Sequence, residues 1–289
     1  MKYHLETVLL QPGASFRTEY NIGPVVDCVF HVHPECELTL VESGFGTRFV
    51  GASLEPFSEM DLVLAGGMLP HHYLSCRAES TGEEWSKMRV VKFLPEFCGR
   101  DFLELPESAA IKTMLTEAKR GLHVPLKTAK NVYKPLTEMY DLEGLPKILK
   151  FLEILEILSH APLRPLNLVA PEAGDFKPDD RLNQVLNFIH HRLECGRDVC
   201  LPEVAAKACM TPPAFSSYFH RATRRGFIEY VIELKLNYAT QLLIRTDRSV
   251  LDIALESGFT NLSNFNRRFR AAKGMTPGMY RREFRKSTL

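Results

Sequence analysis

The stretch from residue 249 to residue 282 reads SVLDIALESGFTNLSNFNRRFRAAKGMTPGMYRR and decides how the C-terminal part of the chain folds. Ser249, with Asp252 three residues later, forms a capping box, so we expect a helix to begin there. Gly258 can adopt a positive φ and is expected to end that helix. Asn261 can cap a second helix, because its side chain accepts a hydrogen bond from a backbone amide of the first turn. The pattern predicts a helix, a tight turn and another helix.

The second of these helices is predicted to have two different faces. Its apolar face consists of Leu262, Phe265, Phe269 and Ala272, which recur at three- and four-residue spacing. Its outward residues are expected to be Ser263, Asn264, Asn266, Arg267 and Arg270. Hydroxyl, amide and guanidinium groups are the side chains that contact base edges and phosphates of DNA. We therefore predict that this helix reads a nucleic acid.

A less regular copy of the pattern lies about fifty residues earlier. Thr211 followed by two prolines predicts a helix start, because a proline in the first turn gives up only an amide without an intrahelical partner. Phe215 and Phe219 then repeat the spacing of Phe265 and Phe269. The residues expected to do the corresponding reading are Ser216, Ser217, His220 and Arg221. From about Phe227 to Arg245, apolar residues at helical spacing predict a long helix that connects the two copies.

Residues 180–285 resemble the DNA-binding region of the AraC/XylS family of bacterial transcription regulators, and the second copy follows the family signature through Thr276-Pro277 and Tyr280-Arg281. The resemblance implies an all-α domain of two helix-turn-helix units that binds double-stranded DNA. It also implies an activator that contacts RNA polymerase. One departure is Arg224, which stands where the second copy has Gly274, so the turn after the first recognition helix is expected to differ.

The charge distribution favours DNA binding over a merely solvated arginine face. Residues 178–289 carry eighteen Lys and Arg against eleven Asp and Glu, a net charge of +7, whereas residues 1–177 carry eighteen against twenty-four, a net charge of −6. The total of +1 conceals this asymmetry. A basic module suits contact with the phosphate backbone, because releasing condensed counterions supplies the sequence-independent part of the affinity.

The first hundred residues predict strands. Alternating or continuous apolar runs, separated by Gly, Pro and Ser, lie at Val26–Val32, Leu38–Val41, Thr47–Val50, Leu62–Leu64 and Met88–Phe93. Many short strands with turn signals favour a β-barrel or sandwich. The fold class expected for the whole chain is thus α+β, with an N-terminal barrel, flanking helices and the helical C-terminal domain.

Within these strands lies the sequence His31-Val-His-Pro-Glu-Cys-Glu37, followed later by His71. It resembles the cupin fold, whose first motif is His-x-His, three residues and Glu, and whose second motif ends in a histidine. The resemblance implies an effector site formed by His31, His33, Glu37 and His71, to which Arg48 of the next strand would add. The same four residues are adequate ligands for a divalent first-row metal. Three roles stay open for these four residues: they bind an effector directly through hydrogen bonds, they hold a metal, or they are core residues whose polar groups satisfy one another.

A polar site with hydrogen-bond donors and acceptors would suit a sugar-like effector, which cupin-type sensors in this family often bind. The alternative from another class is a metal-dependent cupin enzyme with an appended DNA-binding module. A third reading is a constitutive DNA-binding protein. We take the chain as a regulator and not as an enzyme, so no catalytic residue is assigned. No cofactor is assigned either, and a divalent metal at the four-residue site stays an open alternative.

Helices are expected over residues 105–160. The segment Leu145–Leu158 is apolar on more than one face, so one side can cover the barrel while the other meets a second copy in a homodimer. A single intramolecular core would explain the same pattern nearly as well. The helix around Ala109–Gly121 is an equal candidate for that contact. Residues 161–178 contain four prolines and a glycine and predict a linker. The expected domains are therefore 1–160 for effector binding and 179–289 for DNA binding.

Composition fits a soluble two-domain protein: of 289 residues, 45% are hydrophobic and 25% charged. No apolar run is long enough to span a bilayer, and the N-terminus lacks the features of a signal peptide, so we expect a cytoplasmic protein without a membrane partner. The cysteines lie at positions 28, 36, 76, 98, 195, 200 and 209, without a Cys-x-x-Cys pair. They are expected to be reduced thiols.

Overall fold

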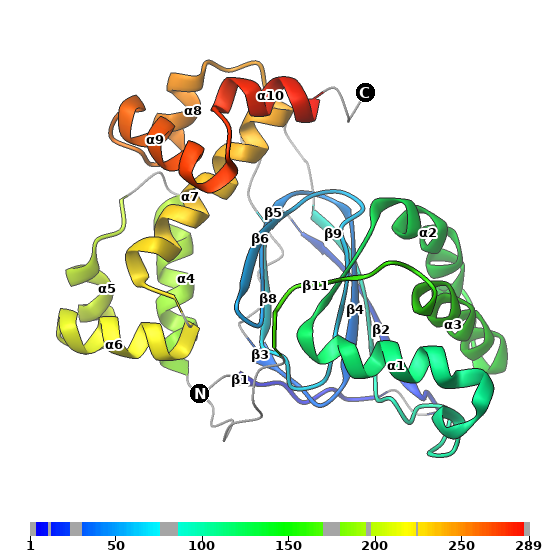
Figure 1. The fold of residues 1–289 in the computed structure, drawn as a ribbon. Helices are drawn as coiled ribbons and strands as arrows, with labels where there is room; N and C mark the ends of the chain where they lie inside the picture. Colours follow the sequence, from blue (N-terminus) through cyan, green and yellow to red (C-terminus); the bar gives the residue numbers. More distant parts are fainter. Residues whose placement is uncertain are drawn as a thin grey trace.

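The structure, a computed structural model, describes residues 4–10, 13–23, 31–75, 86–169, 180–194, 198–223 and 225–285. It contains an N-terminal domain of sheets and helices and a C-terminal domain of helices alone, which lie side by side in Figure 1. No helix within these ranges combines the length and apolar character needed to cross a membrane.

The N-terminal domain contains two sheets. The five-stranded sheet has the order β1 (His4–Leu5), β3 (His31–Val32), β8 (His71–Ser75), β5 (Gly46–Val50) and β6 (Ser53–Phe57). The six-stranded sheet has the order β11 (Arg164–Pro165), β10 (Leu122–Val124), β7 (Leu62–Ala65), β4 (Cys36–Ser43), β9 (Ser86–Phe93) and β2 (Phe16–Gly23). Only β1 and β3 pair in parallel among the described strands.

Four of the predicted strands are confirmed as parts of β4, β5, β7 and β9. The fifth, Val26–Val32, falls mostly outside the described residues, and only its end is seen, as β3. The region expected to be helical, 105–160, also contains a strand, β10, which pairs with β7 and thereby extends the six-stranded sheet. A strand of three residues is too short to leave a recognisable period in the sequence.

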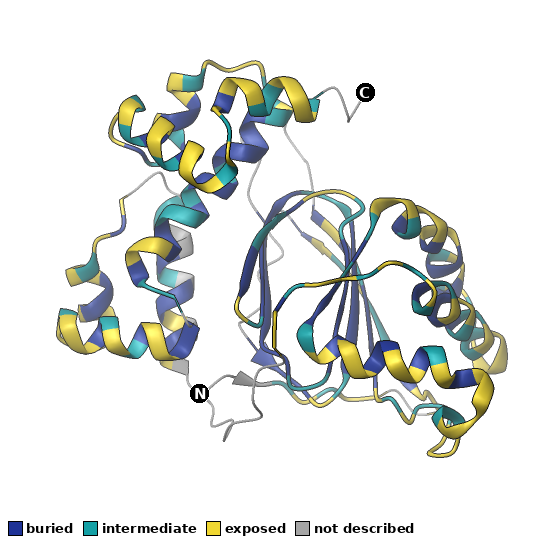
Figure 2. Ribbon diagram, viewed as in Figure 1, coloured by how far each residue is buried: buried dark blue, intermediate teal, exposed yellow. Residues whose placement is uncertain are grey.

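Strand β4 shows how the two faces of the six-stranded sheet differ. Leu38 and Leu40 point to one face and belong to a large buried apolar cluster shared with the helices. Glu37 and Thr39, which alternate with them, point to the space between the two sheets, where the Thr39 hydroxyl donates to Glu37 Oε1 at 2.6 Å. The helices that cover the apolar face are α1 (Ala109–Glu117), α2 (Leu126–Tyr140) and α3 (Gly144–Ser159), on the side away from the C-terminal domain (Figures 1 and 2). Three short 3-10 helices, η1 (Phe102–Glu104), η2 (Pro106–Ser108) and η3 (Ala118–Arg120), flank α1.

The N-terminal domain extends beyond the predicted boundary at residue 160. Arg164 and Pro165 pair with β10 as strand β11. Asn167 is buried, its side-chain amide donates to the carbonyl oxygens of Val50 and Arg120, and its Oδ1 accepts from the amide of Ala52. The first part of the predicted linker 161–178 is thus attached to the domain, through strand β11 and through the hydrogen bonds of Asn167 with backbone groups of the domain.

The C-terminal domain is built on one long helix. Its helices are α4 (Asp180–Glu194), α5 (Leu201–Lys207), α6 (Pro212–Thr223), α7 (Phe227–Arg245), α8 (Val250–Glu256), α9 (Leu262–Lys273) and α10 (Pro277–Arg285). The first half of α7 contributes Tyr230 and Leu234 to a buried cluster with Phe215 and Phe219 of α6. Its second half contributes residues such as Ala239 and Leu243 to a separate cluster with Phe265 and Phe269 of α9. The predicted pair of units on one connecting helix is confirmed.

The predicted helix ends in the second unit are also confirmed. The Ser249 side chain accepts a hydrogen bond from the Asp252 amide at 3.1 Å, and the Asn261 side chain accepts one from the Asn264 amide at 2.8 Å. Gly258 and Gly274 have φ values of +79° and +73°, which a residue with a Cβ adopts at a cost. These local interactions set the angle between α8 and α9.

Candidate DNA interface and buried polar cluster

Helix α9 presents its polar face to solvent. Phe265 and Phe269 are completely buried, so the opposite face is turned outward by the helical repeat. The predicted DNA-contacting residues Ser263, Asn266, Arg267 and Arg270 are exposed, and Asn264 is partly exposed. Arg267 Nη2 donates a hydrogen bond to Asn264 Oδ1 at 3.0 Å, one turn away on the same helix. The structure thus brings these five side chains together on one accessible surface.

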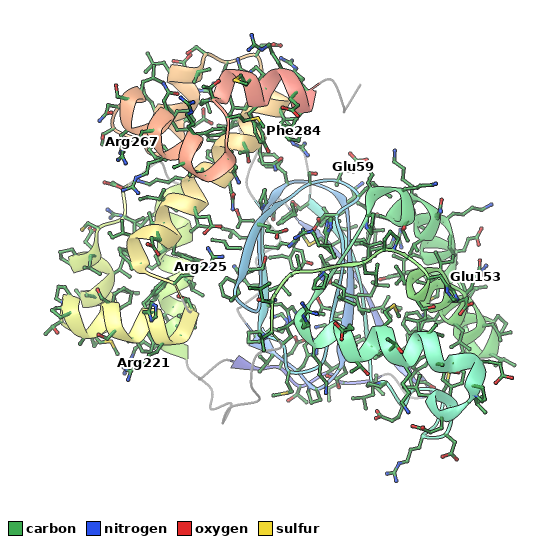
Figure 3. The ribbon with its side chains drawn as sticks, in the orientation of Figure 1. Glu59, Glu153, Arg221, Arg225, Arg267 and Phe284 are labelled. Atoms are coloured by element: carbon green, nitrogen blue, oxygen red, sulfur yellow. The ribbon has the colours of Figure 1, made fainter. Side chains whose placement is uncertain are left out.

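Helix α6 occupies the equivalent position in the first unit. Ser217, His220 and Arg221 are exposed and Ser216 is partly exposed, while Phe215 and Phe219 are buried. Figure 3 shows Arg221 projecting from α6 and Arg267 lying at α9, both away from the N-terminal domain. The first unit offers fewer charged groups, so its reading face is less suited to phosphate and guanine contacts than that of α9. Arg224, where the turn was expected to differ, lies outside the described residues.

Lys235 of α7 contacts both units, a role that the sequence did not suggest. Its Nζ donates to the carbonyl oxygen of Gly258, in the turn between α8 and α9, at 2.8 Å. The same ammonium forms an ion pair with Asp198, which lies before α5, at 2.8 Å. Because Asp198 and Gly258 belong to different units, Lys235 connects the two units.

The four residues of the predicted effector site come together between the two sheets. His31 and His71 lie on β3 and β8 of one sheet, His33 follows β3, and Glu37 lies on β4 of the other. Glu37 Oε2 lies 3.2 Å from the Nε2 atoms of both His33 and His71. The ring centroids of His31 and His71 are 4.3 Å apart. All four side chains are buried, and each offers one ligand atom within 4.8 Å of the others.

The charges of this cluster stabilise one another. Burial alone would raise the pKa of the Glu37 carboxyl, but the His71 and His33 rings outweigh burial and hold this pKa well below its usual range. Burial would lower the pKa of His71, yet the adjacent Glu37 carboxylate outweighs that effect and raises it. Nδ1 of His71 donates to the carbonyl oxygen of Leu69 at 2.8 Å, which directs Nε2 into the cluster. This buried Nε2 has no well-aligned hydrogen-bond partner among the described residues.

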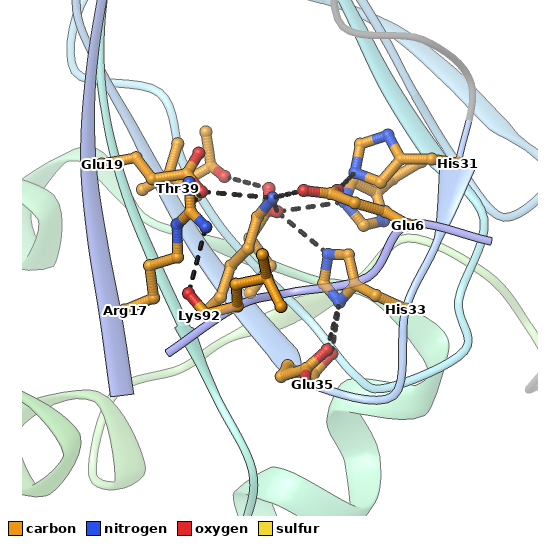
Figure 4. Close-up of polar contacts among 12 residues, drawn as sticks. Glu6, Arg17, Glu19, His31, His33, Glu35, Thr39 and Lys92 are labelled. Carbon is orange, nitrogen blue, oxygen red and sulfur yellow. Dashed lines mark hydrogen bonds and ion pairs between the residues drawn. The ribbon is translucent and has the colours of Figure 1, made fainter. Parts of the chain in front are cut away.

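Lys92 and Glu6 border the cluster (Figure 4). The Lys92 ammonium lies 2.7 Å from a Glu6 oxygen and 3.8 Å from Glu37 Oε2. The other Glu6 oxygen lies 3.1 Å from His31 Nε2. Burial would lower the pKa of Lys92, but the surrounding carboxylates, Glu37 foremost, raise it. Sequence reasoning missed both residues, because neither is part of the motif and only the sheet pairing brings them to it.

Arg48 does not join this cluster. Its guanidinium is buried and pairs with Asp61 at 2.8 Å and with Glu55 at 3.0 Å. Asp61 also contacts the ring of His123 at 3.0 Å, and Arg164 binds both oxygens of Glu55. Within the described residues, the ion pairs of Arg48 therefore belong to a second polar group between the sheets.

Comparison with known proteins identifies the C-terminal region. Residues 204–283 match a family described as a helix-turn-helix domain. The chain is 34% identical over 103 residues to an uncharacterized HTH-type transcriptional regulator, YtdP, of Bacillus subtilis (strain 168), covering 36% of this chain and 13% of that protein. It is 32% identical over 118 residues to the transcriptional activator NphR of Rhodococcus sp, covering 40% of this chain and 34% of that protein. The matches thus span a minor part of each relative's length.

Solved structures give two further likenesses. The DNA-binding domain of AdpA, in complex with a target DNA, is 25% identical with a TM-score of 0.34, covering 36% of this chain and 95% of that one. ToxT from Vibrio cholerae O395 is 11% identical with a TM-score of 0.35, covering 92% of this chain and 97% of that one.

The double unit on α7 and the family match define the class of the C-terminal region, which is a helix-turn-helix DNA-binding domain. This match agrees with the resemblance of residues 180–285 to the AraC/XylS signature.

Proposed function

We propose that this chain is a sequence-specific DNA-binding regulator of transcription, an activator, that responds to a small effector bound between the two sheets of its N-terminal domain. The observation that carries the proposal is the exposed polar face of α9, with Arg267 and Arg270 free of the protein core. The net charge of +7 over residues 178–289 supports contact with a polyanion. The similarity to a protein named as a transcriptional activator supports the sign of regulation.

The effector site in this proposal is the cluster of His31, His33, Glu37 and His71. His71 Nε2 lies 3.2 Å from Glu37 Oε2 but makes no well-aligned hydrogen bond within the described residues, so a ligand hydroxyl at this point would improve the hydrogen bonding of both groups. Donors and acceptors close to one another match the hydroxyl groups of a sugar-like molecule. The cupin-like motif supports the same reading.

A metal-dependent enzyme is the second candidate function, and the compact arrangement of three imidazoles and a carboxylate favours it. These residues would hold a divalent first-row metal, which would supply a Lewis acid at the site. Lys92 disfavours a bound metal, because an ammonium 3.8 Å from Glu37 repels a cation bound to that carboxylate. The proposal therefore stays with direct contact between effector and side chains.

Association with a second copy and with RNA polymerase belongs to the same proposal. On α3, Leu145 and Leu149 are 64% and 57% exposed, which supports that helix as the contact in a homodimer. The apolar residues Ile111, Met114 and Leu115 of α1 are instead buried in the domain core, so α1 is the poorer candidate. Sedimentation of the wild type and of Leu149→Glu would separate a dimer from a monomer.

Selection of duplexes from a random pool by the full-length chain tests the DNA-binding part of the proposal. Enrichment of one sequence, with an affinity that falls steeply as salt rises, is the expected result. A flat salt response or an unenriched pool would contradict it. Thermal-shift screening against a library of sugars, with metal analysis of the same sample, tests the effector part, because a ligand of the native state raises its stability. Stoichiometric metal with turnover of a substrate would favour the enzyme.

A further inference from the structure

The β5–β6 hairpin has one face toward the space between the sheets and one toward the C-terminal domain. In its register Arg48 pairs with Glu55, and Phe49 pairs with Leu54. Arg48 and Glu55 point inward, where they pair with Asp61 and Arg164. Because side chains alternate along a strand, Phe49 and Leu54 point outward. The inner and outer groups are therefore adjacent residues on the same two strands.

The outer face of the hairpin is buried against the first helix-turn-helix unit. Phe49 and Leu54 belong to one buried cluster with residues of α4, α6 and α7, among them Val185, Phe219 and Phe227. Phe49 and Leu54 retain exposures of only 3% and 4%, although they lie on the outside of their own sheet. The C-terminal domain is what covers them.

Polar contacts also join the hairpin to the C-terminal domain. Arg225, two residues after the end of α6, donates from Nε and Nη2 to the carbonyl oxygen of Ala52, in the hairpin turn, at 3.0 and 2.9 Å. Arg225 also pairs with Glu233 of α7. Farther along α7, the Arg245 guanidinium lies 4.6 Å from the ring centroid of Phe45, just before β5. Figure 3 shows Arg225 on the side of the C-terminal domain that faces the sheets.

The hairpin also adjoins the four-residue cluster. Strand β5 pairs with β8, and in that register Val50 lies opposite His71. A ligand that moves His71 therefore acts on a strand hydrogen-bonded to β5, whose other neighbour is β6. The chain of contacts runs from His71 through β5 and the hairpin turn to Arg225 at the end of the first recognition helix.

We propose that the β5–β6 hairpin couples the polar groups between the sheets to the position of α6, with Arg225 as the positioning residue that carries the coupling. The biological role of this coupling rests on the proposed function, whereas its test by hydrogen exchange does not. The two faces of the hairpin share one close-packed backbone, so a change in the inner contacts that shifts this backbone also shifts the outer contacts. Release or rotation of the inner groups consequently moves Ala52, Phe49 and Leu54 against the first unit.

A double-mutant cycle in the full-length chain tests the coupling without knowledge of the effector. Glu55→Gln weakens the inner ion pairs, and Arg225→Ala removes the contact with Ala52. The readouts are hydrogen exchange over residues 212–223 and affinity for a duplex selected from a random pool by the wild type. Glu42→Gln is the matched control, because Glu42 pairs with Arg89 and accepts a hydrogen bond from Tyr20, both on strands of the other sheet.

In the wild-type background, Glu55→Gln should change α6 exchange and DNA affinity by about fivefold or more, the lower end of ordinary coupling between sites. In the Arg225→Ala background the same substitution should change both by less than about twofold, and Glu42→Gln should have no such effect in either background. Equal effects of Glu55→Gln in both backgrounds would overturn the proposal.

A second variant and a second readout cover the cases in which Glu55→Gln does not fold or no duplex is selected. If Glu55→Gln fails to fold, Arg164→Gln perturbs the same pair from its more exposed partner, with the same expected and contradicting results. If the wild type selects no duplex, the proposed function fails, while the exchange readout still decides the coupling by the same comparison. The two proposals can thus fail separately.

Discussion

Arg267 is held by Asn264, whose side-chain oxygen accepts its hydrogen bond at 3.0 Å on the exposed face of α9. The Asn264 amide is in turn the donor to the cap residue Asn261, at 2.8 Å. Asn264 therefore both completes the start of the helix and holds the exposed guanidinium of Arg267. A side chain already ordered in the free protein loses less conformational entropy when it binds.

Arg267→Ala should weaken binding to a selected duplex by about 1–3 kcal/mol and relax preference at one base pair, because a bidentate arginine–guanine contact is worth that much. Binding to random duplexes should change far less. Competition titrations with single-base variants of the site measure both effects. Equal losses on selected and random DNA would show that Arg267 contacts phosphate alone.

Lys235→Met should weaken binding to DNA that engages both units while leaving binding to a single half-site nearly unchanged. The ammonium bonds to Gly258 and Asp198 span the two units, and a hydrogen bond with a charged partner contributes about 1.5–3 kcal/mol. Footprints and affinities on duplexes with one or two groove segments check this. Similar losses on both duplexes would mean that Lys235 supports only the fold of one unit.

The double variant His31→Ala with Glu37→Ala should lose the thermal shift caused by any effector that the sugar screen identifies. Removal of buried partners leaves the remaining groups of the cluster unpaired, at about 1–3 kcal/mol each. Thermal-shift titration is the measurement, with Glu42→Gln as a variant that should respond normally. A folded double variant with unchanged half-saturation would place the effector elsewhere.

The ion pairs of Glu55 should make the free energy of unfolding depend on pH between the unfolded pKa of 4.5 and the folded pKa of about 2. Burial would raise its pKa, but bonds from Arg164 and the charge of Arg48 lower it from 4.5 to about 2. A depressed carboxyl pKa contributes stability above the unfolded value of 4.5, and this contribution is lost as pH falls toward 2. Glu55→Gln should therefore cost about 2 kcal/mol at pH 7, discounted for partial exposure, and less at pH 3. Urea unfolding at the two pH values measures it, and a pH-independent cost would contradict the assignment.

The sequence predicted the second helix-turn-helix unit well because its signals are local. Ser249 and Asp252, or Asn261 and its helix, interact over three residues, so the pattern alone specifies the contact. The contact of Lys235 with Gly258 joins residues 23 apart, and the sequence carries no mark of it. For the same reason the four-residue cluster could be predicted from its motif, whereas the neighbours Lys92 and Glu6 could not.

Arg48 shows a further limit of prediction. The sequence analysis placed it at the effector site with the histidines, but its guanidinium pairs with Glu55 and Asp61. A buried guanidinium needs carboxylates within hydrogen-bonding distance, and only the folded structure shows that Asp61 and Glu55 supply them. Likewise, the prolines of residues 161–178 suggested a free linker, yet Asn167 anchors its first part.

The attachment of Asn167 to the hairpin turn affects the local concentration of the DNA-binding domain near the hairpin. Asn167 bonds to Ala52, the same hairpin turn that Arg225 contacts, so the chain leaves the N-terminal domain beside the docking surface. Ten residues, 170–179, then lead to α4, and a chain of that length reaches at most about 35 Å. A domain detached from the hairpin would thus remain at an effective concentration on the order of millimolar. The fraction of docked molecules then does not depend on how many copies of the protein the cell contains.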